Sequence, residues 1–242
     1  MRKSVQLTTK INKGFIAKLT FIFLFSITYI SPIHSDGNPT TEPLPDIRPV
    51  SEQLFSKISC QELSYPAFQA AMEAHKVLLS KRTLKNDSIL TIVDFSKPSN
   101  EKRFFVIDVK NKKILHKELV AHGKNTGMLF AKNFSNIAQS LQSSLGMYLT
   151  AETYHGKHGY SLRLDGVVKG LNDKARQRAI VIHGANYVSE SFAKIHGRIG
   201  RSFGCPALSY EVSTPIINTI KNQSCLFLYH PELNQNKLLA TI

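Results

Sequence analysis

The sequence lacks the patterns by which most metal and phosphate sites are recognised. Its nine histidines include no H-E-x-x-H motif, and its three cysteines form no pair with zinc-finger spacing. The stretch "GRIGRSFG" (residues 197–204) fits neither the Walker A nor the dinucleotide-binding pattern, and it leads into a cysteine and a proline rather than a helix. We therefore expect no metal and no other cofactor, and we interpret His155 and His158 as exposed residues of a turn.

The N-terminal apolar run is too short to span a membrane comfortably. Leu19–Ile30 has 12 residues, whereas a transmembrane helix needs about 20. The run follows a basic lead-in and precedes small and polar residues, which is the order of a secretory signal, and no cysteine behind it could accept a lipid. We expect residues 1–35 to be a cleaved signal peptide, with a retained anchor as the alternative, and the protein to be exported to the periplasm or cell envelope with no stable membrane span.

Acidic residues are in the minority, with 17 Asp and Glu against 31 Lys and Arg. Loss of the leader would remove five basic and no acidic residues, which leaves 26 against 17. Such a surface favours an anionic partner, which for an exported protein means an envelope polymer or lipid headgroups. Because the chain has no nucleic-acid-binding motif and no basic run interleaved with aromatic residues, we expect no nucleic-acid partner.

The three cysteines, Cys60, Cys205 and Cys225, are an odd number, so at least one thiol stays unpaired. Export would place them where disulfides persist. A Cys60–Cys225 disulfide would leave Cys205 free, but the sequence does not show whether the two backbones approach closely enough to be bridged.

Polar residues and prolines without apolar periodicity make residues 36–50 a flexible linker. Residues 51–242 then read as one domain without internal repeats. We expect helices from about Ser64 to Leu79 and from near Thr214, and a short helix at 136–141.

Short runs of β-branched and aromatic residues predict most of the domain to be strands. The loop 155–159 is expected to join two of them as a five-residue hairpin turn. No βαβ rhythm requires a parallel sheet, so we predict a mainly β fold with a few flanking helices. The predicted strands are 88–95, 103–109, 113–122, 147–154, 160–168, 179–182 and 224–229.

Cys205 is the best candidate for a catalytic group, although a cysteine between Gly204 and Pro206 is more commonly a buried apolar residue. A cysteine nucleophile needs a base, because its thiol is mostly protonated at neutral pH. His183 follows a buried strand, and the carbonyl of Gly184 could orient its ring. The backbone N–H groups of the Gly204–Cys205 turn could stabilise an oxyanion. Spacing alone leaves the two interpretations of Cys205 evenly matched.

The stretch "VIHGANYVSESFAKIHGRIGRSFGCPAL" resembles the His and [Ser/Thr]-x-Gly-Cys motifs of the L,D-transpeptidases (YkuD-like), in particular the murein L,D-transpeptidase catalytic domain proteins. The likeness extends over about residues 51–229 and includes "LVAHGKNTG" and "SSLGMYLTAETYHGKHGYSLRLDG". It implies a β-sandwich-like catalytic domain that acts on peptidoglycan stem peptides.

By this resemblance Cys205 is the nucleophile, His183 its base, and Gly184 the residue whose carbonyl holds the imidazole. In the family the cysteine attacks the carbonyl of the third residue of a tetrapeptide stem and expels the terminal D-alanine. An amine of a neighbouring stem then resolves the thioester and gives a 3-3 cross-link. Water as the acceptor gives carboxypeptidase trimming instead.

Two departures from the broader family lie beside the nucleophile: Phe203 replaces a histidine, and Pro206-Ala207 replaces an aliphatic residue followed by Asn or Arg. We expect substrate to be bound by Arg201, Ser202, Gly204 and Tyr154. Arg201 could bind a stem carboxylate or make a surface salt bridge. Tyr154 and the turn 155–159 could form part of a lid, although a tyrosine at a strand end is more commonly half-buried core.

Three other functions are alternatives. A hydrolase of the same bonds would differ only in the acceptor, and a non-catalytic wall-binding module would keep the fold. A papain-like or NlpC-like peptidase is disfavoured, because its cysteine precedes its histidine and lies at a helix N-terminus. Here His183 precedes Cys205, which is expected in a loop.

Overall fold

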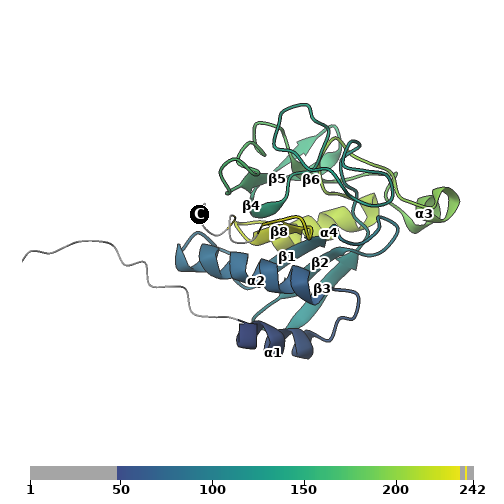
Figure 1. The fold of residues 1–242 in the computed structure, drawn as a ribbon. Coiled ribbons are helices and arrows are strands. Elements are labelled where there is room, and N and C mark those ends of the chain that lie inside the picture. The colour runs from purple at the N-terminus through teal and green to yellow at the C-terminus, as the bar shows by residue number, and fades with distance from the viewer. Residues whose placement is uncertain (1–47, 235–237, 239–242) are drawn as a thin grey trace, which may run out of the picture. The chain divides into compact units, whose positions relative to one another are not determined.

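The computed structural model of the chain describes residues 48–234 and Leu238. The expected signal peptide, and the expected linker apart from its last three residues, lie outside this part of the chain. The described part contains eight strands in one sheet, in the order β3-β2-β1-β8-β4-β5-β6-β7, and four helices (Figure 1).

The strands account for the mainly β architecture, which confirms the predicted fold class. They are β1 (Ile89–Asp94), β2 (Phe104–Asp108), β3 (Lys113–Glu118), β4 (Gly146–Gly156), β5 (Gly159–Gly166), β6 (Val181–Gly184), β7 (Ala207–Leu208) and β8 (Cys225–Tyr229). The helices are α1 (Arg48–Ile58), α2 (Tyr65–Ser80), α3 (Glu190–His196) and α4 (Tyr210–Ile220).

The sheet is mixed, which the sequence did not indicate. β8 pairs parallel with β1 and antiparallel with β4, and the short β7 pairs parallel with β6. β1 and β8 lie at opposite ends of the described chain, whereas β6 and β7 are joined through the short helix α3. The pairing of β6 with β7 matters most for function, because it brings His183 level with Ala207, two residues after Cys205.

The core lies around the central strands β1 and β8, of which every residue is buried. Such strands are covered on both faces, which explains their nearly continuous hydrophobic sequence. Helix α2 packs against β8 and β1, as Figure 1 shows, and α4 packs against β6, β1 and β5. On α4 the core side chains are Ile216, Ile217 and Ile220.

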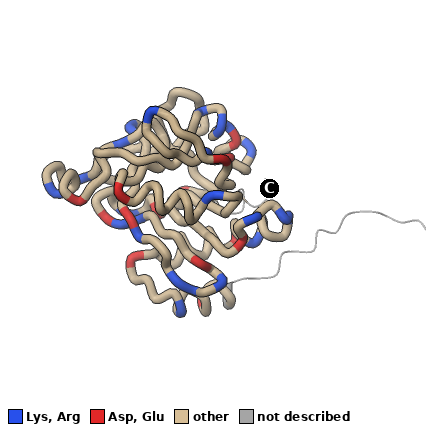
Figure 2. Tube along the Cα trace, turned by 180° about the vertical axis from the view of Figure 1, so that it is seen from behind, with Lys and Arg blue, Asp and Glu red and all other residues tan. Residues whose placement is uncertain are grey.

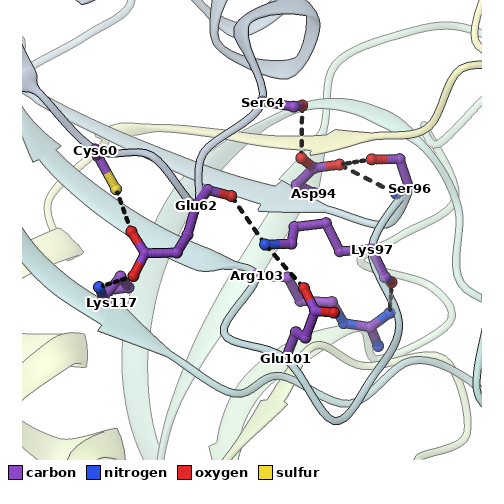
Figure 3. A network of polar contacts seen from close by, with 9 residues as sticks. All are labelled: Cys60, Glu62, Ser64, Asp94, Ser96, Lys97, Glu101, Arg103 and Lys117. Carbon is purple, nitrogen blue, oxygen red and sulfur yellow. Dashed lines mark hydrogen bonds and ion pairs between the residues drawn. The ribbon is translucent and has the colours of Figure 1, made fainter.

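Helix α2 begins as predicted, because Ser64 accepts a hydrogen bond from the backbone N–H of Ala67 at 3.4 Å. The same hydroxyl donates to the Asp94 carboxylate at 2.6 Å. Ser96 donates to that carboxylate through both its hydroxyl and its backbone N–H, as Figure 3 shows. The buried Asp94 therefore fastens the start of α2 to the end of β1.

Several local predictions are wrong. Residues 136–141 form turns rather than a helix, and α4 begins at Tyr210 rather than near Thr214. The β4–β5 hairpin turn has two residues instead of five, because Gly156 pairs with Gly159. Helix α1 occupies the last three residues of the expected linker, and α3 was not predicted.

The Cys60–Cys225 disulfide is not formed, because both residues are free cysteines. Cys225 is fully buried in β8 and belongs to the core. Cys60 lies near the surface, where its thiol donates to the Glu62 carboxylate, which also binds Lys117 (Figure 3). Cys205 is free as well.

Basic residues are spread around the fold with acidic residues between them, as Figure 2 shows. This distribution resembles an ordinary solvated surface more than a single continuous binding face. Of the helices in the described residues, none is sufficiently long and apolar to cross a membrane.

Candidate active site

Cys205 and His183 line one cavity of roughly 370 Å³. The predicted substrate-binding residues Arg201, Ser202 and Tyr154 line it too. Gly184 and Gly204 do not line the cavity themselves, but each contacts a residue that does. The carbonyl of Gly184 contacts the ring of His183, and the N–H of Gly204 donates to the hydroxyl of Ser202. The segments that meet here come from the β4–β5 turn, the approach to β6, and the loop before β7.

Strand pairing places Cys205, the candidate nucleophile, near His183, the candidate base. His183 lies within β6, which is held between β5 and the parallel β7, so its side chain is buried and its backbone is fixed by the sheet. Cys205 lies just before β7 and is half-buried. Both residues therefore reach the same end of the sheet from adjacent segments.

The His183 ring is oriented by its own chain. Its Nδ1 lies 2.9 Å from the carbonyl oxygen of Gly184, and because a carbonyl can only accept, Nδ1 carries the proton and Nε2 is the free acceptor. Burial lowers the pKa of His183, and the charges of His158 and Lys157 add to this effect against the Gly184 hydrogen bond. The imidazole is accordingly neutral at neutral pH.

The pKa of the Cys205 thiol moves in the opposite direction. Burial raises it, while the Val181 backbone N–H and the positive charges of Arg178 and Lys157 lower it in part. The Sγ atom lies 3.6 Å from the carbonyl oxygen of Ala179, and within the described residues no hydrogen bond joins it to His183. The resting pair is therefore a neutral thiol and a neutral imidazole.

The turn that presents Cys205 is braced by Ser202. The Ser202 hydroxyl donates to the carbonyl of Cys205 at 2.6 Å and accepts from the N–H of Gly204 at 3.1 Å. Ser143 donates to the Gly204 carbonyl at 3.1 Å. Since Ser202 occupies the N–H of Gly204, only the N–H of Cys205 in this pair is available to an oxyanion.

Gly204 cannot be replaced without strain. Its φ is +125°, and an added Cβ would lie 2.8 Å from the backbone oxygen of Gln142. Gly184 is constrained by contact alone, since a Cβ there would lie 2.4 Å from the ring of Tyr210. Both glycines are therefore required by the packing around the site.

Arg201 makes backbone contacts rather than the surface salt bridge that was one alternative. Its Nη1 donates to the carbonyl oxygens of Lys124 at 2.9 Å and of Gly127 at 3.2 Å. Within the described residues no carboxylate lies within ion-pair distance of it. Arg201 also lines the cavity, so the other alternative, a bound carboxylate, is compatible with this position.

Three aromatic residues, Tyr154, Tyr187 and Phe203, line the cavity. Tyr154 stacks under the guanidinium of Arg163, whose Cζ is 4.4 Å from the ring centroid. Phe203, which departs from the wider family pattern, is 68% exposed. An apolar side chain this exposed at a cavity is available for contact with a ligand.

The sequence did not single out Arg178, which lines the cavity from the approach to β6. Its guanidinium donates to the carbonyls of Ser135 and Gln142 and to the hydroxyls of Ser140 and Ser144. The nearby Arg176 instead forms exposed ion pairs with Glu152 and Asp165. Nothing in "RQR" (176–178) distinguishes the arginine that points inward.

His158 was expected to be exposed, and this is wrong. It is half-buried and its ring stacks on that of His183, with centroids 4.4 Å apart and an interplanar angle of 25°. His155 is exposed as expected. Among the described residues no group of three or more His, Cys, Asp or Glu side chains is placed to hold a metal ion.

A buried polar chain supports the Arg201 side of the cavity. Arg103 is fully buried, and it donates to Nδ1 of His122 at 2.8 Å and to the carbonyls of Val120 and Lys97. Burial lowers the pKa of Arg103 to about 9. Burial and the Arg103 charge lower the pKa of His122 to about 3, so this imidazole is neutral and its Nε2–H faces the same Gly127 carbonyl that Arg201 contacts.

The family model of the L,D-transpeptidase catalytic domain matches residues 59–229. A search of the curated proteins gave no significant match.

Solved structures were matched at low identity. An L,D-transpeptidase from Mycobacterium smegmatis is 12% identical over 59% of this chain and 59% of its own, with a TM-score of 0.38. The helical cell shape determining protein Pgp2 from Campylobacter jejuni (K307A mutant) is 16% identical over 68% and 57%, with a TM-score of 0.37. An L,D-transpeptidase from Xylanimonas cellulosilytica is 14% identical over 77% and 94%, with a TM-score of 0.35.

The chain spans somewhat more than half of the first two of these proteins. The family model, in contrast, covers the domain from directly after α1 to the end of β8, including His183 and the turn before β7. The chain therefore belongs to the L,D-transpeptidase catalytic domain family.

Proposed function

We propose that this protein is a peptidoglycan L,D-transpeptidase that works by cysteine acyl transfer. The observation that carries the proposal is that Cys205 and His183 line one cavity, with the unprotonated Nε2 of His183 available as a base. Export to the periplasm or cell envelope would bring the enzyme to this substrate, as the N-terminal sequence suggests.

In the proposed first half-reaction, Sγ of Cys205 attacks the carbonyl of the third stem residue while Nε2 of His183 takes the thiol proton. The ring and the thiol must approach each other on substrate binding, as catalytic hydrogen bonds commonly do. The N–H of Cys205 donates to the oxyanion. Collapse breaks the peptide bond, the imidazolium gives its proton to the leaving D-alanine amine, and a thioester remains.

In the second half-reaction, an amine of a neighbouring stem attacks the thioester, and His183 takes its proton. Release of the Cys205 thiol completes a 3-3 cross-link. If water attacks instead, the product is a shortened stem and the enzyme is a carboxypeptidase.

The test is incubation of the purified protein with tetrapeptide-bearing muropeptides, followed by mass spectrometry. Cross-linked dimers are expected, whereas tripeptides alone would indicate the hydrolase. Cys205→Ala should abolish both products and Cys60→Ala, which changes the other partly exposed thiol, should abolish neither. A protein that binds muropeptides without changing them would be a wall-binding module.

Labelling with a carbapenem, which acylates members of this family at the active cysteine, tests the residues directly. The mass increase should map to the peptide that contains Cys205 and should be lost in His183→Ala. Labelling of Cys60 or Cys225 alone would contradict the assignment.

A further inference from the structure

The cavity around Cys205 is lined by three cationic side chains, Lys157, Arg178 and Arg201. No Asp or Glu is among its described lining residues. A cavity with this charge attracts carboxylates and disfavours ammonium groups. Any ligand carrying both groups should therefore enter with a carboxylate toward the cations.

The three cations are not equally available. Arg178 and Arg201 are held by carbonyl oxygens of their own chain. Lys157 has no hydrogen bond or ion pair within the described residues, and its side chain is exposed. Lys157 is therefore the cavity cation that can donate to a ligand carboxylate without first breaking another hydrogen bond.

The position of Lys157 is well defined although it lies on a surface turn. Gly156 and Gly159 pair across the end of the β4–β5 hairpin, so Lys157 and His158 alone form the tip. The stacking of His158 on His183 fixes this tip over the base. The charge of Lys157 lowers the pKa of both His183 and Cys205, which indicates that it is close to the reacting groups.

We propose that Lys157 binds a carboxylate of the stem peptide next to the bond that is broken, so that the enzyme prefers stems with a free carboxylate over amidated stems. This inference rests on the proposed function. Two carboxylates qualify, one on the side chain of the third residue and one on the terminal D-alanine. Amidation would remove the negative charge and present an NH₂ donor to an ammonium.

Three tetrapeptide stems test the proposal: one with both carboxylates free, one amidated on the third side chain, and one amidated at the terminus. For the wild-type protein, kcat/KM should fall about tenfold with at least one amidated stem, the size expected for loss of one charged hydrogen bond. The stem that loses activity identifies the bound carboxylate.

Lys157→Gln should lose about tenfold on the free stem and treat it like the amidated one, whereas Lys157→Arg should keep the preference. The matched control is Lys169→Gln, an exposed lysine that does not line this cavity and should behave as wild type. If Lys157 acted only through its electric field at Cys205 and His183, Lys157→Gln would change the turnover of all three stems equally.

Binding to Cys205→Ala, measured by calorimetry, separates this inference from the proposed function. Tighter binding of the free stem, lost in Cys205→Ala/Lys157→Gln, supports the role of Lys157 even if no stem is turned over. Equal binding and equal turnover of all three stems would overturn the inference and leave the transpeptidase assignment intact. A preference that survives Lys157→Gln would also overturn it.

Discussion

Replacement of Arg178 by methionine should weaken the fold and the reactivity of Cys205 together. The guanidinium is the charged donor for the backbone carbonyls of Ser135 and Gln142. Each hydrogen bond to a charged group contributes about 1.5–3 kcal/mol to the free energy of unfolding. Because Arg178 is partly exposed, we expect its two bonds to carbonyls to contribute at the lower end of this range. We expect Arg178→Met to lower the free energy of unfolding by about 2–4 kcal/mol.

The second consequence concerns the thiol. The charge of Arg178 lowers the pKa of Cys205 against the effect of burial, so its removal should raise that pKa further. Since the thiolate is the form that reacts, alkylation of Cys205 at pH 8 should slow, and its pH profile should move to higher pH. Arg178→Lys keeps the charge without the planar fork, so it should retain more of the reactivity than of the stability.

The assay is the second-order rate of iodoacetamide alkylation between pH 6 and 10, with urea unfolding measured on the same samples. A Cys60→Ala background leaves Cys205 as the accessible thiol, because Cys225 is fully buried. Arg176→Met, in the exposed ion pairs nearby, is the control and should leave the alkylation profile unchanged. If the Arg178→Met profile matched the wild type, the charge of Arg178 would not be what lowers the pKa of Cys205.

Two further predictions concern the supports of the site. The pKa of His122 is about 3 in the folded protein and near 6.5 in the unfolded chain. Between these pH values the unfolded chain binds a proton that the folded protein does not. Stability that is present above pH 6.5 is therefore lost as the pH falls. Urea unfolding of His122→Asn at several pH values should show a slope smaller by about 1.4 kcal/mol per pH unit, and an unchanged slope would contradict this. Gly204→Ala should slow carbapenem acylation more than tenfold, because the new Cβ meets the Gln142 oxygen and displaces the N–H of Cys205. Gly170→Ala, which also has a positive φ but no atom within 4 Å of the added Cβ, should leave acylation unchanged.

Those parts of the fold that depend on local sequence were predictable. The helix expected from about Ser64 is α2, and the strands expected at 103–109 and 113–122 contain β2 and β3. Helix α3 was missed because its seven residues bury no side chain and therefore carry no hydrophobic periodicity. The prediction of a five-residue loop at 155–159 was wrong because its two glycines, which usually mark a turn, extend the strands instead.

The candidate site likewise has residues that the sequence could identify and residues that only the fold could. Cys205, His183 and Gly184 belong to two short motifs, so a resemblance could identify them. Arg178 and Lys157 lie outside those motifs, and only the tertiary fold brings their charges to the thiol. A sequence pattern cannot reveal which arginine of "RQR" is drawn inward by the carbonyls of Ser135 and Gln142.

The two cations should nevertheless act differently on the proton transfer from Cys205 to His183. The equilibrium of that transfer depends on the difference between the two pKa values. The charge of Lys157 lowers both pKa values, so its effects on the transfer largely oppose each other. The charge of Arg178 lowers the pKa of Cys205 and is not among the causes of the His183 shift, so it favours the thiolate–imidazolium pair. Loss of Arg178 should therefore affect the chemical step, whereas loss of Lys157 should be seen mainly in which stem is bound.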